Sequence, residues 1–206
     1  MRSTKSRPYR MRRRAEQVDA TRLRITEAAV RLHTTVGPAR TSIAAVAEEA
    51  GVTRLTVYRH FADLDALFLA CRAHWMAQDP PPDAGAWRAI PDLETRALRA
   101  FGELYGWYSE RGEELFPIVR DAASLPLSTL QARGAENDEL AAALVAGFAG
   151  PDEHGRSLRA VAGHLVDFMT WRSFVVGQGL DEEATVDVAV RILTMLVGAG
   201  GRARRS

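Results

Sequence analysis

Several residue types and signals are scarce in this sequence, and each absence narrows the possible functions. Cysteine occurs once in 206 residues, at Cys71, so no internal disulfide can form, which suits a reducing compartment. No apolar run reaches the roughly 18 to 20 residues that a membrane-spanning helix needs. No apolar segment follows the Arg-rich N-terminus, so we expect no secretory signal. These absences predict a soluble cytoplasmic protein.

The signatures of catalysis are also missing. The five histidines do not lie at metal-ligand spacing from one another or from the cysteine. No Gly-rich phosphate loop, GxSxG or HExxH motif occurs. We therefore expect no metal, no cofactor and no enzyme activity, and an all-helical enzyme with an unrecognised site is the least favoured interpretation. Strand patterns and internal repeats are absent too, which predicts an all-α fold of about nine helices.

Charge is distributed unevenly along the chain. The formal net charge is only +1, yet residues 1–60 carry a net +8 and residues 61–206 a net −7. Residues 1–18 hold seven basic residues and one acid and have no hydrophobic period, so we expect a disordered arm there. A basic N-terminal third favours a polyanionic partner. Arg12, Arg13 and Arg14 lie closest to the folded part and are candidate DNA contacts, although a merely solubilising terminus would have the same composition.

The segment 41–61 reads as two short helices around a tight turn. Ile43, Val46, Ala47 and Ala50 repeat at helical spacing. Gly51 can take the left-handed conformation that closes a helix, and Thr53 can cap a second helix that buries Val57 and Phe61. This pattern is typical of a helix-turn-helix, whose second helix enters the DNA major groove. A helical hairpin without a partner is the alternative, which the basic residues upstream disfavour.

This segment also resembles a known family. The run from Ala47 through Gly51 and Thr53 to Phe61, followed by an acidic helix start and Leu67, is similar to the DNA-binding domain of the TetR/AcrR family of bacterial transcriptional regulators over roughly residues 21–69. The resemblance implies that Tyr58 and His60 contact phosphate and that Thr53, Arg54, Thr56 and Arg59 face the groove. Thr41 and Ser42, at the start of the preceding helix, can also hold phosphate.

The sequence departs from the family pattern at two positions. Leu55 stands where the family most often has Gly, and Leu64 where it most often has Lys. Leu55 could place an apolar side chain against a thymine methyl group. Leu64 removes one cationic phosphate contact, which the Arg-rich arm could replace.

The domain organisation is predicted as a basic arm at 1–18, a helix-turn-helix domain with a linking helix at 19–79, and a helical body at 80–206. In the body we expect helices beginning near 92, 113 and 127, a long helix over 156–177 and a last helix after Asp181. The last two are apolar on two sides, which favours a homodimer through these C-terminal helices, as the resemblance also implies.

The aromatic residues of the body suggest a second site. His164, Phe168 and Trp171 recur at helical spacing, and with Tyr105 they are candidates to line a pocket for a small apolar or aromatic effector. For any one of these residues taken alone, ordinary core packing is the favoured interpretation. The sequence as a whole favours a homodimeric DNA-binding regulator, a repressor released by an effector, in the cytoplasm on the nucleoid. The alternative is an activator or architectural protein that needs no effector.

Overall fold

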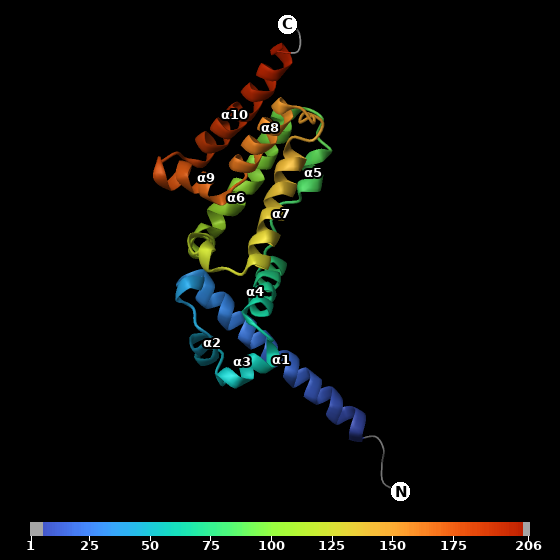
Figure 1. The fold of residues 1–206 in the computed structure, drawn as a ribbon, viewed down its shortest axis with the longest axis vertical. Coiled ribbons are helices and arrows are strands. Elements are labelled where there is room, and N and C mark those ends of the chain that lie inside the picture. Colours follow the sequence, from blue (N-terminus) through green and yellow to red (C-terminus); the bar gives the residue numbers. More distant parts are fainter. Residues whose placement is uncertain (1–5, 204–206) are drawn as a thin grey trace. The chain divides into compact units, whose positions relative to one another are not determined.

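The chain folds into helices only, within the residues that the structure describes. The structure is a computed structural model that describes residues 6–203, without the side chains of residues 6–8, 10 and 199–203. Two compact units are present (Figure 1). The first holds the chain through Asp79 together with Phe116–Thr129, and the second holds Pro80–Leu115 and the chain from Leu130 onward. The all-α prediction is confirmed.

The first unit begins with a single long helix, α1 (Ser6–Thr35). Its start at Ser6 differs from the predicted disordered arm and the predicted helix start at 19. Arg, Ala, Glu, Gln and Met are good helix formers, and the ion pair between Arg12 and Glu16 adds local support. The only proline, Pro8, falls in the first turn, where its missing N–H is tolerated. Residues 1–5 of the predicted arm lie outside the described residues.

The helix-turn-helix prediction is confirmed by α2 (Ile43–Glu49) and α3 (Arg54–His60), which precede the linking helix α4 (Leu64–Gln78). Side chains of Ser42, Thr53 and Asp63 each accept a hydrogen bond from a backbone N–H in the first turn of the helix that follows. These caps satisfy amides that the helices themselves leave unpaired, and so they fix where each helix begins.

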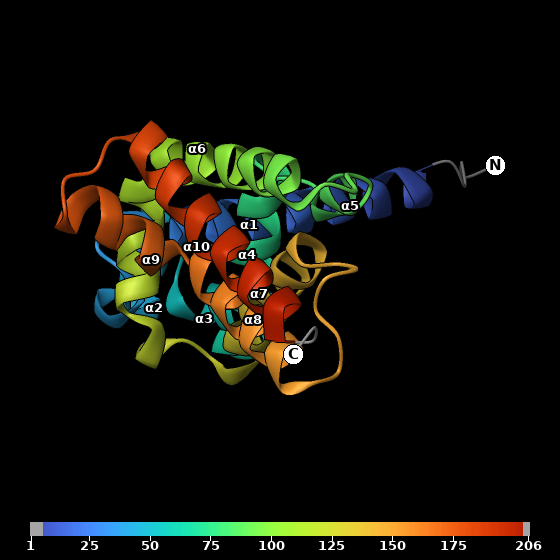
Figure 2. The same ribbon diagram turned by 90° about the horizontal axis from the view of Figure 1, so that it is seen from above.

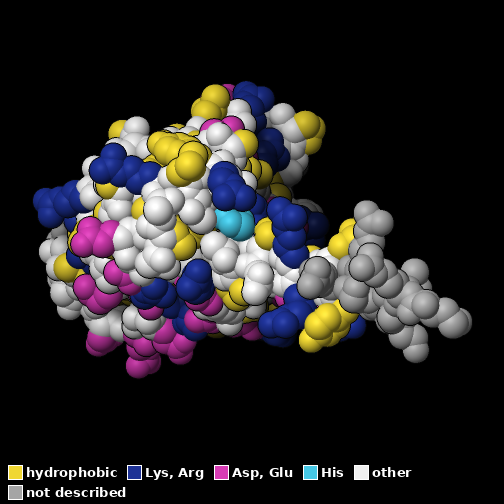
Figure 3. All heavy atoms as spheres, turned by 90° about the horizontal axis from the view of Figure 1, so that it is seen from below, with side chains coloured by type: hydrophobic (Ala, Val, Ile, Leu, Met, Phe, Trp, Pro, Cys, Tyr) yellow, Lys and Arg dark blue, Asp and Glu magenta, His cyan; other side chains and the backbone are white. Residues whose placement is uncertain are grey.

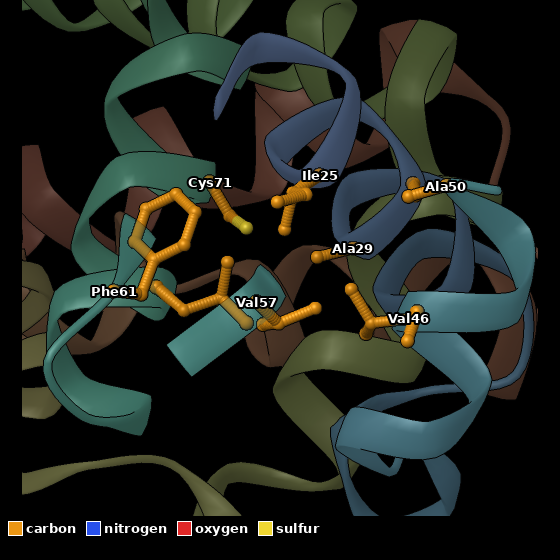
Figure 4. Packing of buried hydrophobic residues seen from close by; sticks show 10 residues of the cluster. Ile25, Ala29, Val46, Ala50, Val57, Phe61 and Cys71 are labelled. Carbon is orange, nitrogen blue, oxygen red and sulfur yellow. The ribbon is translucent and has the colours of Figure 1, made fainter. Parts of the chain in front are cut away.

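One apolar cluster holds these helices together (Figure 4). Ile25 and Ala29 of α1 lie against Val46 of α2 and Val57 of α3, and all four are essentially excluded from solvent. Phe61 and Cys71 close the cluster from the α4 side. Burial of these side chains supplies the hydrophobic stabilisation of the unit, since every apolar group removed from water contributes.

The first unit also includes a segment from the middle of the chain, 116–129, which contains the short helix η2 (Ala122–Ser124). Arg120 donates to the carbonyl of Val36 at 3.1 Å, and the Asp121 carboxylate accepts from the Ala39 N–H at 3.1 Å. The turn between them contains Gly37 at φ +95°, a conformation that favours glycine, and leads into η1 (Pro38–Arg40). These bonds explain why 116–129 belongs with the N-terminal helices, a long-range relation that no local pattern could predict.

The second unit contains α5 (Ala84–Arg88), most of α6 (Leu93–Arg120) and α7 (Leu127–Leu144), α8 (Glu153–Leu165), α9 (Phe168–Arg172), the π-helical turn η3 (Ser173–Gly177) and α10 (Glu182–Ala203). α10 packs on α8, and α9 continues into η3 (Figure 2). None of the described helices is long and apolar enough to cross a membrane.

Two predictions about these helices are wrong. Separate helices near 92 and 113 are one helix, α6, which runs without interruption and contains Pro117 in its last turn. The predicted helix 156–177 is instead interrupted at Val166 and Asp167, where the Asp167 side chain accepts from the Met169 N–H and caps α9. The hydroxyl groups of Tyr105 and Tyr108 donate to the carbonyls of Leu165 and Val166 at 2.8 and 2.7 Å, which stabilises this break.

A buried arginine completes the core of the second unit. Arg96 on α6 is 3% exposed, and its guanidinium donates to the carbonyls of Ile90, Ala143, Leu144 and Ala146. Carbonyls in the last turn of a helix lack intrahelical donors, and a cation at that end also complements the helix dipole. Arg96 therefore serves as the cap of α7.

His33 makes the stability of the first unit depend on pH. Its buried imidazole stacks on Phe68 of α4, with ring centroids 4.4 Å apart, and burial lowers the pKa of His33 to about 4. In the unfolded chain the group titrates near its ordinary value of about 6.5. Between these two pKa values the unfolded chain binds a proton that the folded chain does not.

We predict that the free energy of unfolding falls by about 3 kcal/mol from His33 as the pH drops from about 7 to about 4, whereas above about pH 7 this stability is fully present. Urea unfolding of the wild type and of His33→Leu at both pH values measures this change. The variant lacks the titrating imidazole, so the difference between the two proteins removes the contribution of all other titrating groups. Equal pH dependence in the two proteins would contradict the prediction.

Candidate nucleic-acid interface

The core contact of α3 decides which of its side chains face outward. Val57 is buried, and successive residues of a helix point about 100° apart. Leu55 and Arg59 therefore lie on either side of the direction opposite Val57, and both are exposed. Arg54 and Tyr58 occupy one flank of the helix, and Thr56 and His60 the other.

Local hydrogen bonds fix the turn before α3 and the residue at which this helix begins. Gly51 has φ +63°, the left-handed conformation in which its N–H can bond back to the Glu48 carbonyl. Thr53 then caps α3 by accepting from the Thr56 N–H at 3.2 Å. The hydroxyl groups of Thr53 and Thr56 also bond to each other at 2.9 Å. These two predicted base contacts are thus partly occupied within the chain.

The four predicted phosphate contacts lie at the edges of the helix-turn-helix. Ser42 caps α2 by accepting from the Ala45 N–H, and the Thr41 hydroxyl donates to the Gly37 carbonyl at 2.9 Å. Tyr58 is 56% exposed, whereas His60 is half-buried. Tyr58 and Ser42 are therefore both accessible to a partner, while Ser42 and Thr41 also have local structural roles.

Arg22 braces the end of α3, and sequence reasoning missed it. Its guanidinium donates to the His60 carbonyl and lies 4.1 Å from the centre of the Phe61 ring. Together the two contacts join α1 to the end of the outward-facing helix. They link positions 38 residues apart, so no local sequence signal could have revealed them.

The three arginines predicted to lie in a flexible arm instead point in different directions from α1. Arg12 pairs with Glu16 at 3.0 Å, and the Arg13 guanidinium lies 5.8 Å from the centre of the Tyr9 ring. Arg14 is exposed and lies about three helical turns before Ile25, hence on the same stripe of α1 that faces the core. Because consecutive helical residues point about 100° apart, these three side chains cannot act as one cluster.

The outer surface agrees with the charge pattern of the sequence. In the view from below, Lys and Arg side chains are spread over much of the face, and Asp and Glu side chains gather toward one edge (Figure 3). Leu64, the other departure from the family pattern, is 51% exposed in the first turn of α4. Leu64 thus adds an exposed apolar side chain to the first unit.

The four residues predicted to line an effector pocket do not all come together. Phe168 and Trp171 have ring centroids 5.4 Å apart, and Tyr108 lies 5.3 and 5.8 Å from them. Tyr105 is fully buried beside Tyr108, whereas His164 is exposed at the end of α8. The break between α8 and α9 separates His164 from the two rings that the sequence placed on one helix with it.

No group of three or more His, Cys, Asp or Glu side chains within the described part of the chain could hold a metal ion.

The helix-turn-helix and the fold around it are similar to those of known proteins. Residues 25–71 match the family described as bacterial regulatory proteins, tetR family. A tetR-family transcriptional regulator from Streptomyces coelicolor has a similar fold, with a TM-score of 0.59 over 91% of this chain and 88% of that one, at 18% sequence identity. No curated protein matches the sequence. The matched residues include all of α2 and α3.

We predict that Arg22→Ala lowers the free energy of unfolding by about 1–2 kcal/mol, because it removes a hydrogen bond to a carbonyl and a cation–π contact. Arg24→Ala is the matched control, since Arg24 is exposed two residues further along α1 and should change stability by less than about 0.5 kcal/mol. Thermal unfolding of the three proteins measures both effects. Equal stability of the two variants would show that Arg22 does not hold α3.

Proposed function

Because the chain belongs to the tetR family of bacterial regulatory proteins, we propose that it is a transcriptional repressor that binds a palindromic DNA operator as a homodimer. The outward ridge of α3 supports this proposal most strongly. Leu55 and Arg59 are exposed there on a rigid helix whose opposite side is fixed in the core. A helix presented in this way fits the width of the major groove.

The side chains divide into base and phosphate contacts. Arg54, Leu55 and Arg59 read base edges, and Thr53 and Thr56 approach the same bases with hydroxyls that already share a hydrogen bond. Tyr58, His60, Thr41 and Ser42 contact phosphates, as does the N-terminus of α2, whose free amides and dipole attract anions.

The helical extension of α1 adds a further phosphate contact. Arg14 lies on the stripe of α1 that continues toward Ile25, while Arg12 and Arg13 are engaged by Glu16 and Tyr9. All three arginines keep their positive charge, so each one that neutralises a phosphate adds to the salt dependence of binding, since counterions are released.

Homodimerisation uses the outer sides of the C-terminal helices. Met169, Val176, Ile192 and Met195 are 43%, 59%, 40% and 73% exposed on α9, η3 and α10. Val190 and Leu193, on the other side of α10, are buried in the core of the chain itself. Two copies that cover this exposed apolar surface would bury it in a symmetric interface.

Release from DNA is assigned to an apolar or aromatic small molecule that binds near Tyr105, Phe168 and Trp171. These rings join α6 to the break between α8 and α9, so a ligand among them must displace ring contacts and change the position of these helices. Such a ligand acts only if it binds the two arrangements with different affinity. A regulator that needs no effector is the second candidate, and the direct packing of the rings on one another is the observation that supports it.

Selection of bound DNA from a random pool tests the proposed function. We expect one enriched, two-fold symmetric sequence, and Arg59→Ala should weaken its binding by about 10-fold or more, because a bidentate contact to guanine contributes about 1–3 kcal/mol of discrimination. Binding of random DNA should fall much less. Equal loss on both DNAs would make Arg59 a phosphate contact. A pool in which no sequence is enriched would contradict the proposal. Repeating the selection in the presence of aromatic ligands tests whether such a ligand releases the protein from DNA.

A second prediction concerns the dimer. Met195→Glu should convert a dimer into a monomer in sedimentation experiments, because the interface would have to bury a charge without a partner. Leu98→Glu is the control, since Leu98 is 50% exposed on α6, outside the proposed interface, and this variant should stay dimeric. A dimeric Met195→Glu protein, or a monomeric wild type, would contradict this interface.

A further inference from the structure

Leu55 carries an exposed apolar surface that the folded chain does not use. It is 70% exposed in the first turn of α3, and the caps of this helix come from Thr53 at one end and from the Phe61 N–H, which donates to the Val57 carbonyl, at the other. The core contacts of α3 come from Val57. A single exposed leucine is common on protein surfaces, so exposure alone assigns no role. The position of Leu55 next to Arg59 on the helix surface is the observation that suggests a role.

Leu55 and Arg59 form one ridge. They are four residues apart, which places them about 40° apart around the helix and about 6 Å apart along it. Stacked bases are about 3.4 Å apart, so the two side chains reach positions about two base pairs apart in a groove. Both flank the direction opposite the buried Val57, so a partner that faces α3 meets this pair first.

The chemistry of the pair limits what it can recognise. The only methyl group on the major-groove edge of the four bases is the 5-methyl group of thymine. A leucine against the amino group of cytosine or adenine would remove water from that group without replacing its hydrogen bond. Arg59 in turn matches the O6 and N7 acceptors of guanine. The Thr53 and Thr56 hydroxyls, already bonded to each other, discriminate less among bases.

We propose that Leu55 is a specificity-determining residue that selects a thymine in each half-site through its 5-methyl group, about two base pairs from a guanine bound by Arg59. This inference rests on the proposed function, because it requires a sequence-specific DNA complex.

Replacement of thymine by uracil tests the contact, because it removes only the methyl group. Each thymine of the selected operator is replaced in turn by deoxyuridine, symmetrically in both half-sites. Wild-type affinity should fall about fourfold for each thymine methyl group that Leu55 covers, the effect of removing one buried methyl group. For Leu55→Ala the same replacement should have no effect, and its affinity for the unmodified operator should already be reduced.

Leu64→Ala is the matched control. Leu64 is also an exposed leucine of the first unit, 51% exposed, but lies in α4 outside the ridge. This variant should respond to uracil as the wild type does. Thermal unfolding of both variants should match the wild type, because neither side chain is buried.

The possible failures are distinguishable. If no sequence is enriched from the pool, the proposed function fails and the inference fails with it. If a sequence is enriched but no thymine responds to uracil, or if the response is as large in Leu55→Ala as in the wild type, the inference is overturned while the proposed function stands.

Discussion

The burial of Val57 against Ile25 and Ala29 is the contact on which the presentation of α3 depends. A seven-residue helix has too few internal hydrogen bonds to be stable alone, so its orientation comes from packing and caps. Once Val57 is fixed inward, the periodicity of the helix places Leu55 and Arg59 outward. Arg22 then fixes the far end of α3 through the His60 carbonyl and the Phe61 ring. The outward surface of α3 is thus determined by a few buried methyl groups and one arginine.

Each unit also contains polar groups that set the ends of its helices. In the second unit, Arg96 bonds to carbonyls at the end of α7, and the Tyr105 and Tyr108 hydroxyls bond to the main chain where α8 ends. In the first unit, Arg120 and Asp121 hold the turn that contains Gly37. A buried polar group without a partner is costly, so these arrangements favour one conformation over its neighbours.

Local signals allowed the helix-turn-helix to be predicted and left other features hidden. The caps at Ser42, Thr53 and Asp63 and the turn at Gly51 all act within three or four residues, so a sequence pattern reveals them. The helical start at Ser6 was missed because a high density of positive charge suggested disorder, although the residues themselves favour a helix. The break at Asp167 was missed although its cap on Met169 is local, because the Tyr105 and Tyr108 hydroxyls that bond to the main chain just before it are distant in sequence. For the site, the outward residues followed from helical periodicity, whereas the pairing of the Thr53 and Thr56 hydroxyls and the role of Arg22 required the structure.

We propose that α3 lies in the major groove with Arg59 against guanine. Methylation of the bound operator by dimethyl sulfate measures this most directly, since the reagent modifies guanine N7 in the major groove and adenine N3 in the minor groove. We predict protection of a guanine N7 in each half-site, and we expect Arg59→Ala to abolish that protection. Protection confined to adenine N3, or guanine protection that persists without the Arg59 side chain, would contradict the account.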